Sequence, residues 1–270
     1  MLYISGASGY IGSALCKHLN KQSIQYNTIR IRIDEPESTG SLLQINKEDT
    51  LIHLGECANI TQANQLGERY IQQNLAALKK LLFLGFNKII YVSSTAVYGE
   101  TGNTPAMEAD SDLVSSHIYT RNKITCEQFI QKHFPEYVIC RLSNVYGGTM
   151  KQDCLFADIL NQLSAPTVTL RNTAHTRDYI HITDVCTAIT QALKINVNGL
   201  YNISAGQSYS VSEIANQLFK IHNATPILKG HSTTTSSQYI CNKKAMQALN
   251  WIPQMDISAG LKTIKVNSHE

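Results

Sequence analysis

The sequence predicts an α/β fold, in which a doubly wound parallel sheet carries a smaller, discontinuous C-terminal α/β part. Short apolar runs alternate with helical patterns up to residue 142, and this alternation indicates parallel strands covered by helices on both faces. A glycine-rich turn, Gly6 to Gly12, follows the first apolar run directly and opens a helical pattern. From Gly147 onward the alternation changes, which indicates a second structural part.

Composition indicates a soluble globular protein without a membrane span. Of the 270 residues, 43% are hydrophobic and 16% are charged, and the net charge of +3 is too small and scattered to indicate nucleic-acid binding. No apolar run reaches the ~18 residues that a membrane span requires. The first strand begins at residue 2, so we expect no signal peptide and a cytoplasmic location.

The cysteines and histidines do not indicate a metal site. The seven cysteines lack CxxC spacing, and the nine histidines show no spacing typical of ligands. We therefore expect reduced thiols and no bound metal.

The N-terminal half reads as alternating strands and helices. Its apolar runs predict strands over 2–5, 26–33, 50–55, 88–93 and 137–142. Its helical spacings predict helices over 11–20, 61–84 and 116–132. Pro36 and Gly40 mark a loop over 35–40, whereas 41–46 fits either a short strand or one or two helical turns.

The C-terminal half has fewer and shorter apolar runs. Helices are predicted over 155–163, 181–195, 211–221 and 243–249. Strands are predicted over 167–170 and 200–203, and the second of these could return to the main sheet.

The first turn has the residues of a phosphate site. The segment Gly6-Ala7-Ser8-Gly9-Tyr10-Ile11-Gly12 joins a strand to a helix. Such a turn presents backbone N–H groups and the positive end of a helix dipole to an anion. Glycines are needed where φ is positive or where the backbone must touch a pyrophosphate.

A second group of residues has acid/base chemistry. Tyr119 and Lys123 lie four residues apart on a predicted helix, so their side chains face the same way. A lysine ammonium near a phenol favours the phenolate, which can take a proton from an alcohol or return it to a ketone. The hydroxyls of Ser93, Ser94 and Thr95 follow a strand, and ligands bind beyond the carboxyl ends of parallel strands. These hydroxyls could instead cap the turn that follows the strand.

Together these motifs resemble the extended short-chain dehydrogenase/reductase family, in its nucleotide-sugar epimerase/dehydratase/reductase branch. Further matches span essentially the whole chain in the family's order, at 51–55, Asn74, 141–147, 176–185 and 249–253. The resemblance implies a Rossmann-type dinucleotide-binding domain over 1–145, to which 182–205 returns. It implies a substrate-binding part over 146–181 and 206–270.

The resemblance also implies roles for single residues. Tyr119 is the acid/base, Lys123 favours its phenolate and holds the nicotinamide ribose, and Ser94 orients the substrate hydroxyl. The cofactor-binding residues implied are Gly6, Ser8, Gly9, Tyr10, Ile11, Gly12, Arg30, Arg32, Leu54, Asn74 and Ser93, with Tyr119 and Lys123. The substrate-binding residues implied are Thr95, Asn144 and Arg177, the last of which could instead pair with Asp178 or Asp184.

The chain departs from the family pattern in its cofactor half. Arg30 and Arg32 share one face of the second strand, where members that prefer NAD carry an acid, so NADP(H) is favoured over NAD(H). Asp34 could still be that acid if the strand is longer. Only 41 residues separate Gly12 from His53, so the third strand or the helix beside it is reduced.

Two enzymatic interpretations and one non-catalytic interpretation follow. Thr95 and Ala96 stand where dehydratases carry acids, so we expect no dehydration. A 4-ketoreductase of nucleotide sugars is favoured over a 4-epimerase with tightly bound NAD. A non-catalytic dinucleotide sensor or scaffold is disfavoured by the intact catalytic residues. The resemblance further suggests a homodimer formed through the helices over 61–84 and 116–132.

Overall fold

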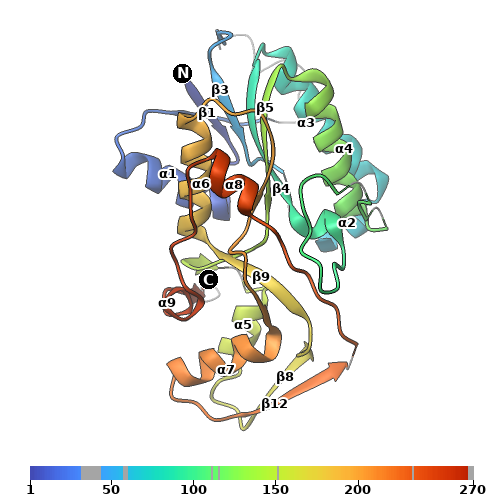
Figure 1. The fold of residues 1–270 in the computed structure, drawn as a ribbon, viewed down its shortest axis with the longest axis vertical. Coiled ribbons are helices and arrows are strands. Elements are labelled where there is room, and N and C mark those ends of the chain that lie inside the picture. Colours follow the sequence, from blue (N-terminus) through green and yellow to red (C-terminus); the bar gives the residue numbers. More distant parts are fainter. Residues whose placement is uncertain are drawn as a thin grey trace.

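A large parallel sheet forms the centre of the molecule (Figure 1). The computed structural model describes residues 1–31, 44–56, 60–110, 112–114, 116–150, 152–232 and 234–266. Among these residues the sheet has six strands in the order β10-β5-β4-β3-β1-β2, and every neighbouring pair is parallel. The strands are β1 (Leu2–Ser5), β2 (Asn27–Ile29), β3 (Thr50–His53), β4 (Lys88–Ser94), β5 (Glu136–Leu142) and β10 (Gly199–Ile203).

Helices cover both faces of this sheet, which confirms the doubly wound α/β prediction. α1 (Tyr10–Lys21) and α6 (Ile182–Lys194) lie on one face, and α3 (Glu68–Phe83) and α4 (Ile118–His133) lie on the other (Figure 1). Because side chains alternate along a strand, Ile52 packs in the core under α1 and α6, whereas Leu51 packs in the core under α3 and α4. Burial on both faces explains why the strands read as nearly continuous apolar runs.

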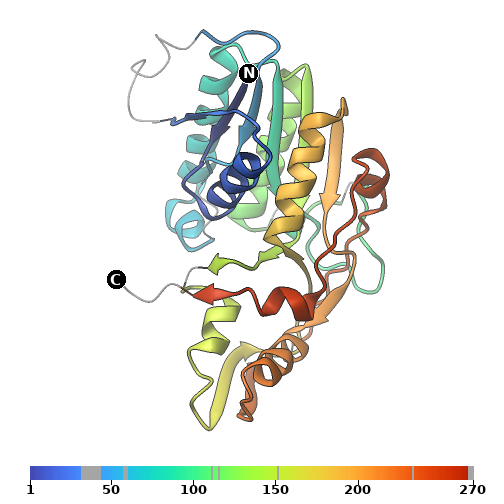
Figure 2. The ribbon, with the colours of Figure 1, turned by 90° about the vertical axis from the view of Figure 1, so that its left-hand side faces the viewer.

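The smaller part lies beyond the carboxyl ends of the large sheet (Figure 2). It contains a sheet of β6 (Asn144–Tyr146), β9 (Thr176–His181) and β11 (Ser208–Ser210), and a pair of β8 (Thr167–Asn172) with β12 (Ile227–Ser232). Helices α5 (Leu155–Leu160), α7 (Val211–Ile221) and α9 (Ile257–Leu261) pack on its own core, in which Phe156 and Leu218 are buried. The short elements η1 (Thr95–Tyr98), β7 (Thr149–Met150), α8 (Lys243–Ala248) and β13 (Lys265–Val266) complete the described chain.

The long helix predicted over 61–84 is wrong in one respect, because the structure breaks it into α2 (Ile60–Leu66) and α3. Gly67 stands between the two helices with a φ of 54°. That left-handed conformation is open to glycine, and it stops the run of helical hydrogen bonds. The other predicted helices begin and end within three residues of the observed ones.

The second strand is also shorter than predicted, since β2 ends at Ile29. Arg32, Asp34, the loop over 35–40 and part of the segment 41–46 lie outside the described residues. All cysteines that the structure describes are free thiols, and Cys57 is not among the described residues. None of the helices within the described ranges combines the length and the hydrophobicity of a membrane span.

Candidate active site

A cavity of about 370 Å³ lies at the carboxyl ends of β1, β3 and β4. Its walls come from the glycine turn, from the end of β3, from α4 and from four later residues, Val145, Met150, Asp153 and Cys154. Seven of the predicted cofactor-binding residues line it: Gly6, Gly9, Tyr10, Ile11, Gly12, Leu54 and Lys123. The predicted phosphate turn and the predicted catalytic lysine therefore meet in one cavity.

The glycine turn brings the backbone close to itself. Gly6 has a φ of +74°, and a Cβ added to Gly12 would lie 2.0 Å from the carbonyl oxygen of Gly6. α1 begins after Gly9, which supplies no side-chain cap, so the first N–H groups of the helix have no side-chain acceptor there. This cradle fits the pyrophosphate of a dinucleotide, because it combines free N–H donors with the positive end of a helix. Ser8 is exposed in the same turn.

Lys123 is buried and reaches the cavity from α4. Its side chain is 4% exposed, and its Nζ donates to the Val92 carbonyl oxygen at 2.9 Å and to Glu56 Oε2 at 2.6 Å. Burial alone would lower the pKa of the ammonium, but the Glu56 carboxylate, and after it Tyr119, hold that pKa above its usual value. Tyr119 lies one helical turn before Lys123 and is half-buried.

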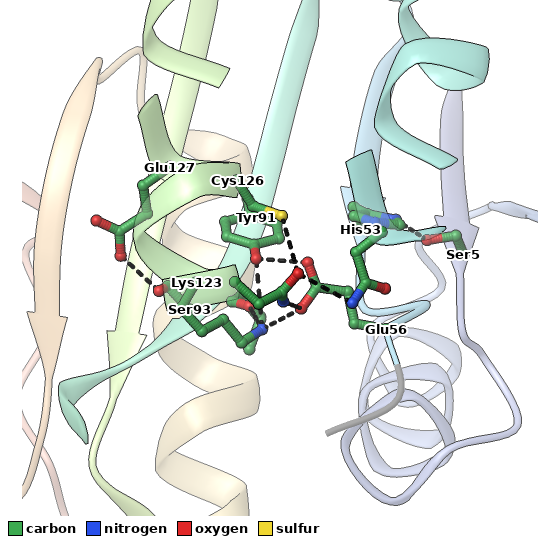
Figure 3. A network of polar contacts seen from close by, with 11 residues as sticks. Ser5, His53, Glu56, Tyr91, Ser93, Lys123, Cys126 and Glu127 are labelled. Carbon is green, nitrogen blue, oxygen red and sulfur yellow. Dashed lines mark hydrogen bonds and ion pairs between the residues drawn. The ribbon is translucent and has the colours of Figure 1, made fainter. Parts of the chain in front are cut away.

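Glu56 connects Lys123 to a buried network (Figure 3). Its Oε1 accepts the Tyr91 hydroxyl at 2.5 Å, and its Oε2 also accepts Asn122 Nδ2 at 3.3 Å. Burial would raise the pKa of this carboxyl, but Lys123 and the other donors hold it below its usual value. Asn74, a predicted cofactor residue, stands behind this network and donates to Asn122 Oδ1 at 3.1 Å.

The three hydroxyls at the end of β4 have different surroundings. Ser93 is buried and donates to Glu127 Oε1 at 2.5 Å, and Glu127 in turn accepts two hydrogen bonds from Arg141. Ser94 is half-buried, and its Oγ accepts the Ala96 N–H at 3.2 Å, so it also caps η1. Thr95 is 2% exposed and turned to Gln238, so its substrate contact stays a prediction.

The other predicted substrate residues lie on neighbouring strands of the smaller part. Asn144, on β6, is exposed and donates to the Asp178 carbonyl oxygen at 3.0 Å. Arg177, on β9, donates to the carbonyl oxygen of Ser236 at 2.9 Å and to its Oγ at 2.7 Å. The carboxylate of Asp178 accepts Ser143 Oγ and two backbone N–H groups instead. The carboxylate of Asp184 accepts the N–H groups of Gln254 and Met255. The alternative in which Arg177 pairs with Asp178 or Asp184 is therefore not formed.

Arg30 follows the carboxyl end of β2 directly and is exposed. It lies at the same edge of the large sheet as the glycine turn, because β1 and β2 are parallel neighbours.

His53 is a buried neutral base in the cavity wall. Its Nδ1 lies 2.6 Å from Ser5 Oγ, and its buried Nε2 has no partner among the described residues. Burial, with a smaller contribution from Lys123, lowers its pKa to about 4, against the opposing effect of Glu56.

We expect His53 to make the protein less stable as pH falls. A histidine whose folded pKa is lowered contributes stability above its unfolded pKa, ~6.5, and loses it as pH falls toward the folded value. Between pH 6.5 and the folded value, His53→Gln should therefore reduce the slope of unfolding free energy against pH by about 1.4 kcal/mol per unit. Urea unfolding at several pH values measures this slope. His222→Gln, which changes an exposed histidine, is the control. Equal slopes in the unaltered protein, His53→Gln and His222→Gln would contradict the expectation.

A comparison of the sequence with known protein families agrees with this site, which combines a cavity, a glycine turn and the helix that carries Tyr119 and Lys123. The model of the NAD dependent epimerase/dehydratase family matches residues 2–204, three quarters of the chain. The chain belongs to this family. The resemblance read from the motifs is thereby confirmed, and the chain is an enzyme of the extended short-chain dehydrogenase/reductase type that uses a nicotinamide dinucleotide.

Proteins similar to this epimerase/dehydratase member match most of its length. The ADP-L-glycero-D-manno-heptose-6-epimerase of Brachyspira hyodysenteriae is 24% identical, over 84% of this chain and 83% of that protein. The structure of RMD from Pseudomonas aeruginosa with NADPH has a TM-score of 0.80 at 20% identity, covering 97% of this chain and 96% of that one. A variant UDP-glucuronic acid 4-epimerase from Bacillus cereus, in complex with a fluorinated UDP-sugar and NAD, has a TM-score of 0.81 at 23% identity, with coverage of 97% and 96%. These similarities confirm the Rossmann-type fold.

Two residues of this epimerase/dehydratase site were not predicted from the sequence. Glu56 and His53 both stand at or just after the carboxyl end of β3, where ligands of parallel sheets bind. An acid directly after the strand predicted over 50–55 was the available signal for Glu56. Its pairing with Lys123 joins residues 67 positions apart, and no local spacing predicts such a contact.

Proposed function

We propose that this member of the epimerase/dehydratase family reduces a keto carbon of a nucleotide sugar, as a 4-ketoreductase. The observation that carries the proposal is the meeting of Lys123 with the glycine turn in one cavity, with Tyr119 one helical turn away. A dinucleotide turn, a phenol and an ammonium are the groups that hydride transfer at an alcohol or ketone requires.

Each side chain has a defined task in this proposal. The glycine turn and the start of α1 would hold the pyrophosphate, and Lys123 would hold the adjacent ribose. The bound cofactor supplies the hydride to the keto carbon. Tyr119 donates a proton to the carbonyl oxygen as the alcohol forms, and Ser94 orients that oxygen.

The substrate half uses residues of the smaller part. Asn144 and Arg177 lie on the paired strands β6 and β9. A planar guanidinium can donate two parallel hydrogen bonds, which suits the diphosphate of a nucleotide sugar. We propose that Arg177 binds this diphosphate and that Asn144 contacts the same substrate.

We further propose that the cofactor is NADP(H), because the exposed Arg30 can pair with a 2′-phosphate. Arg30→Asp should repel that phosphate and lower the ratio of NADPH to NADH affinity by about tenfold or more, which is about 1.4 kcal/mol. Fluorescence titration with both cofactors measures the ratio. Arg69→Asp, which reverses an exposed charge on α3, should leave it unchanged. An unchanged ratio in Arg30→Asp would remove this preference from the proposal.

A 4-epimerase is the second candidate function, favoured by the similarity to the putative UDP-glucose 4-epimerase of Methanocaldococcus jannaschii, which is 27% identical over 98% of this chain and 97% of that protein. An epimerase oxidises and re-reduces one carbon, so it consumes no cofactor in the net reaction. The two functions therefore differ in cofactor stoichiometry.

The deciding experiment incubates the purified protein with a panel of 4-keto and 4-hydroxy nucleotide sugars and follows the absorbance of reduced nicotinamide. Loss of one reduced nicotinamide for each 4-keto sugar consumed supports the reductase. Interconversion of hydroxy sugars without net loss supports the epimerase. If no sugar of the panel gives either result, the proposed function is contradicted.

A further inference from the structure

Glu56 is a buried carboxylate in the wall of the cofactor cavity that the proposed reaction leaves without a role. It follows β3 by three residues, and its side chain is 6% exposed. Figure 3 shows it extending from the end of β3 toward Lys123 and Tyr91, which come from α4 and β4. Three separate elements thus place charged or polar atoms at one point in the cavity wall.

We propose that Glu56 is a positioning residue, whose carboxylate fixes the Lys123 ammonium and offsets part of the charge that Lys123 presents to Tyr119. This inference rests on the proposed role of Tyr119 as the acid/base. It assigns to Glu56 the task of setting the pH range over which the enzyme works.

The geometry fixes the ammonium in one orientation. An ammonium has three donors, and those of Lys123 point to Glu56 Oε2 at 2.6 Å, to the Val92 carbonyl oxygen at 2.9 Å and to the Tyr91 hydroxyl at 3.4 Å. Glu56 is itself held by Tyr91 and Asn122. Because an unpaired buried charge is costly, each member of the ion pair keeps the other in place.

The charges around Tyr119 give Glu56 its electrostatic effect. Tyr119 lies one helical turn before Lys123 on α4, and its charge is one of the influences that raise the pKa of the Lys123 ammonium. A carboxylate on the same ammonium weakens the stabilisation that the ammonium gives to a phenolate. The titratable groups that face this pair from the packed elements are His53, Tyr91, Cys126, Asp153 and Cys154, with Glu127 behind Tyr91.

Most of these neighbours are neutral near pH 7. Burial lowers the pKa of His53 to about 4, and burial raises the pKa values of Tyr91 and Cys126 well above their usual ranges. Burial also raises the pKa of Cys154. Within the described part of this cavity wall, the charged side chains that contact each other are therefore those of Glu56 and Lys123.

The test is a titration of tyrosinate absorbance in the cofactor-free full chain, with each protein compared to its Tyr119→Phe counterpart to isolate the one phenol. Glu56→Gln removes the charge and keeps the shape. We expect its Tyr119 ionisation midpoint to fall by about one pH unit, the lower end of the shift that one neighbouring charge causes. The acidic limb of the pH–rate profile of the oxidative reaction should move in the same direction.

Two further variants make the result specific. Glu56→Asp keeps the negative charge but withdraws it by one methylene, so it should lower the Tyr119 ionisation midpoint by less than Glu56→Gln does. Because the ion pair with Lys123 is retained, Glu56→Asp should fold even if Glu56→Gln does not. Glu68→Gln is the matched control, since Glu68 also pairs with an α4 residue at 2.6 Å, Arg121, but on the surface. Its midpoint should equal that of the unaltered protein.

The inference would be overturned if the Tyr119 ionisation midpoint were unchanged or raised in Glu56→Gln. If only Glu56→Asp folds, an unchanged midpoint in that variant would overturn it. The titration needs neither substrate nor cofactor, so it stays separate from the proposed function. Full turnover in Tyr119→Phe would overturn the proposed function even if the midpoint falls as expected in Glu56→Gln.

Discussion

Tyr119→Phe is expected to lower turnover by about 10²–10⁴-fold, which is the contribution that a positioned acid or base makes. The variant removes one hydroxyl from a half-buried ring and leaves the glycine turn and Lys123 unchanged. Cofactor affinity should therefore stay within about threefold of the unaltered protein, because the groups that would hold the dinucleotide are retained. Steady-state kinetics with an active nucleotide sugar measures turnover, and fluorescence titration measures cofactor affinity.

The control for this variant is Tyr137→Phe. Tyr137 lies near the amino end of β5, whereas the cavity lies at the carboxyl ends of the strands, and the variant loses the same hydroxyl. It should keep normal turnover and normal cofactor binding. Equal turnover in both variants would show that the phenol of Tyr119 carries no proton in the reaction.

The fold could be predicted because its signals are local. Strands buried on both faces produce apolar runs, and the residues between them have helical spacing over ten or more positions. The break at Gly67 could not be predicted in this way, since one glycine inside a helix costs only about 1 kcal/mol and many helices tolerate it. Tertiary packing decides whether the chain continues or bends at such a residue.

The site could be predicted where its residues share an element. Tyr119 and Lys123 are one helical turn apart, and Gly6 to Gly12 form one turn, so their spacing alone brings them together. The partners that come from distant elements could not be read in the same way. Glu56 reaches Lys123 on α4 from beyond the end of β3, and Gln238 accepts the Thr95 hydroxyl from 143 residues away. These contacts depend on how the elements pack, which a local pattern does not contain.

Gly12→Ala is the second variant for which we expect a large effect. Its new Cβ would lie 2.0 Å from the Gly6 carbonyl oxygen, and backbone on both sides of the contact prevents either atom from moving alone. The start of α1 must shift away from β1, which costs about 1–3 kcal/mol as overpacking does and displaces the N–H groups that would hold the pyrophosphate. We expect cofactor affinity to fall by at least about tenfold, which is about 1.4 kcal/mol. Titration calorimetry with the cofactor and urea unfolding measure the two effects.

Gly9→Ala separates a tight contact from the general effect of adding a methyl group to this turn. Gly9 has a φ of −73°, which any residue can adopt, and its added Cβ would lie 3.3 Å from the same Gly6 oxygen. Because a shift of a few tenths of an ångström relieves that contact, its effects on affinity and stability should be clearly smaller. The order of the two variants therefore tests the cradle itself: if Gly12→Ala binds the cofactor as well as Gly9→Ala does, then the close approach of α1 to Gly6 does not shape the dinucleotide site.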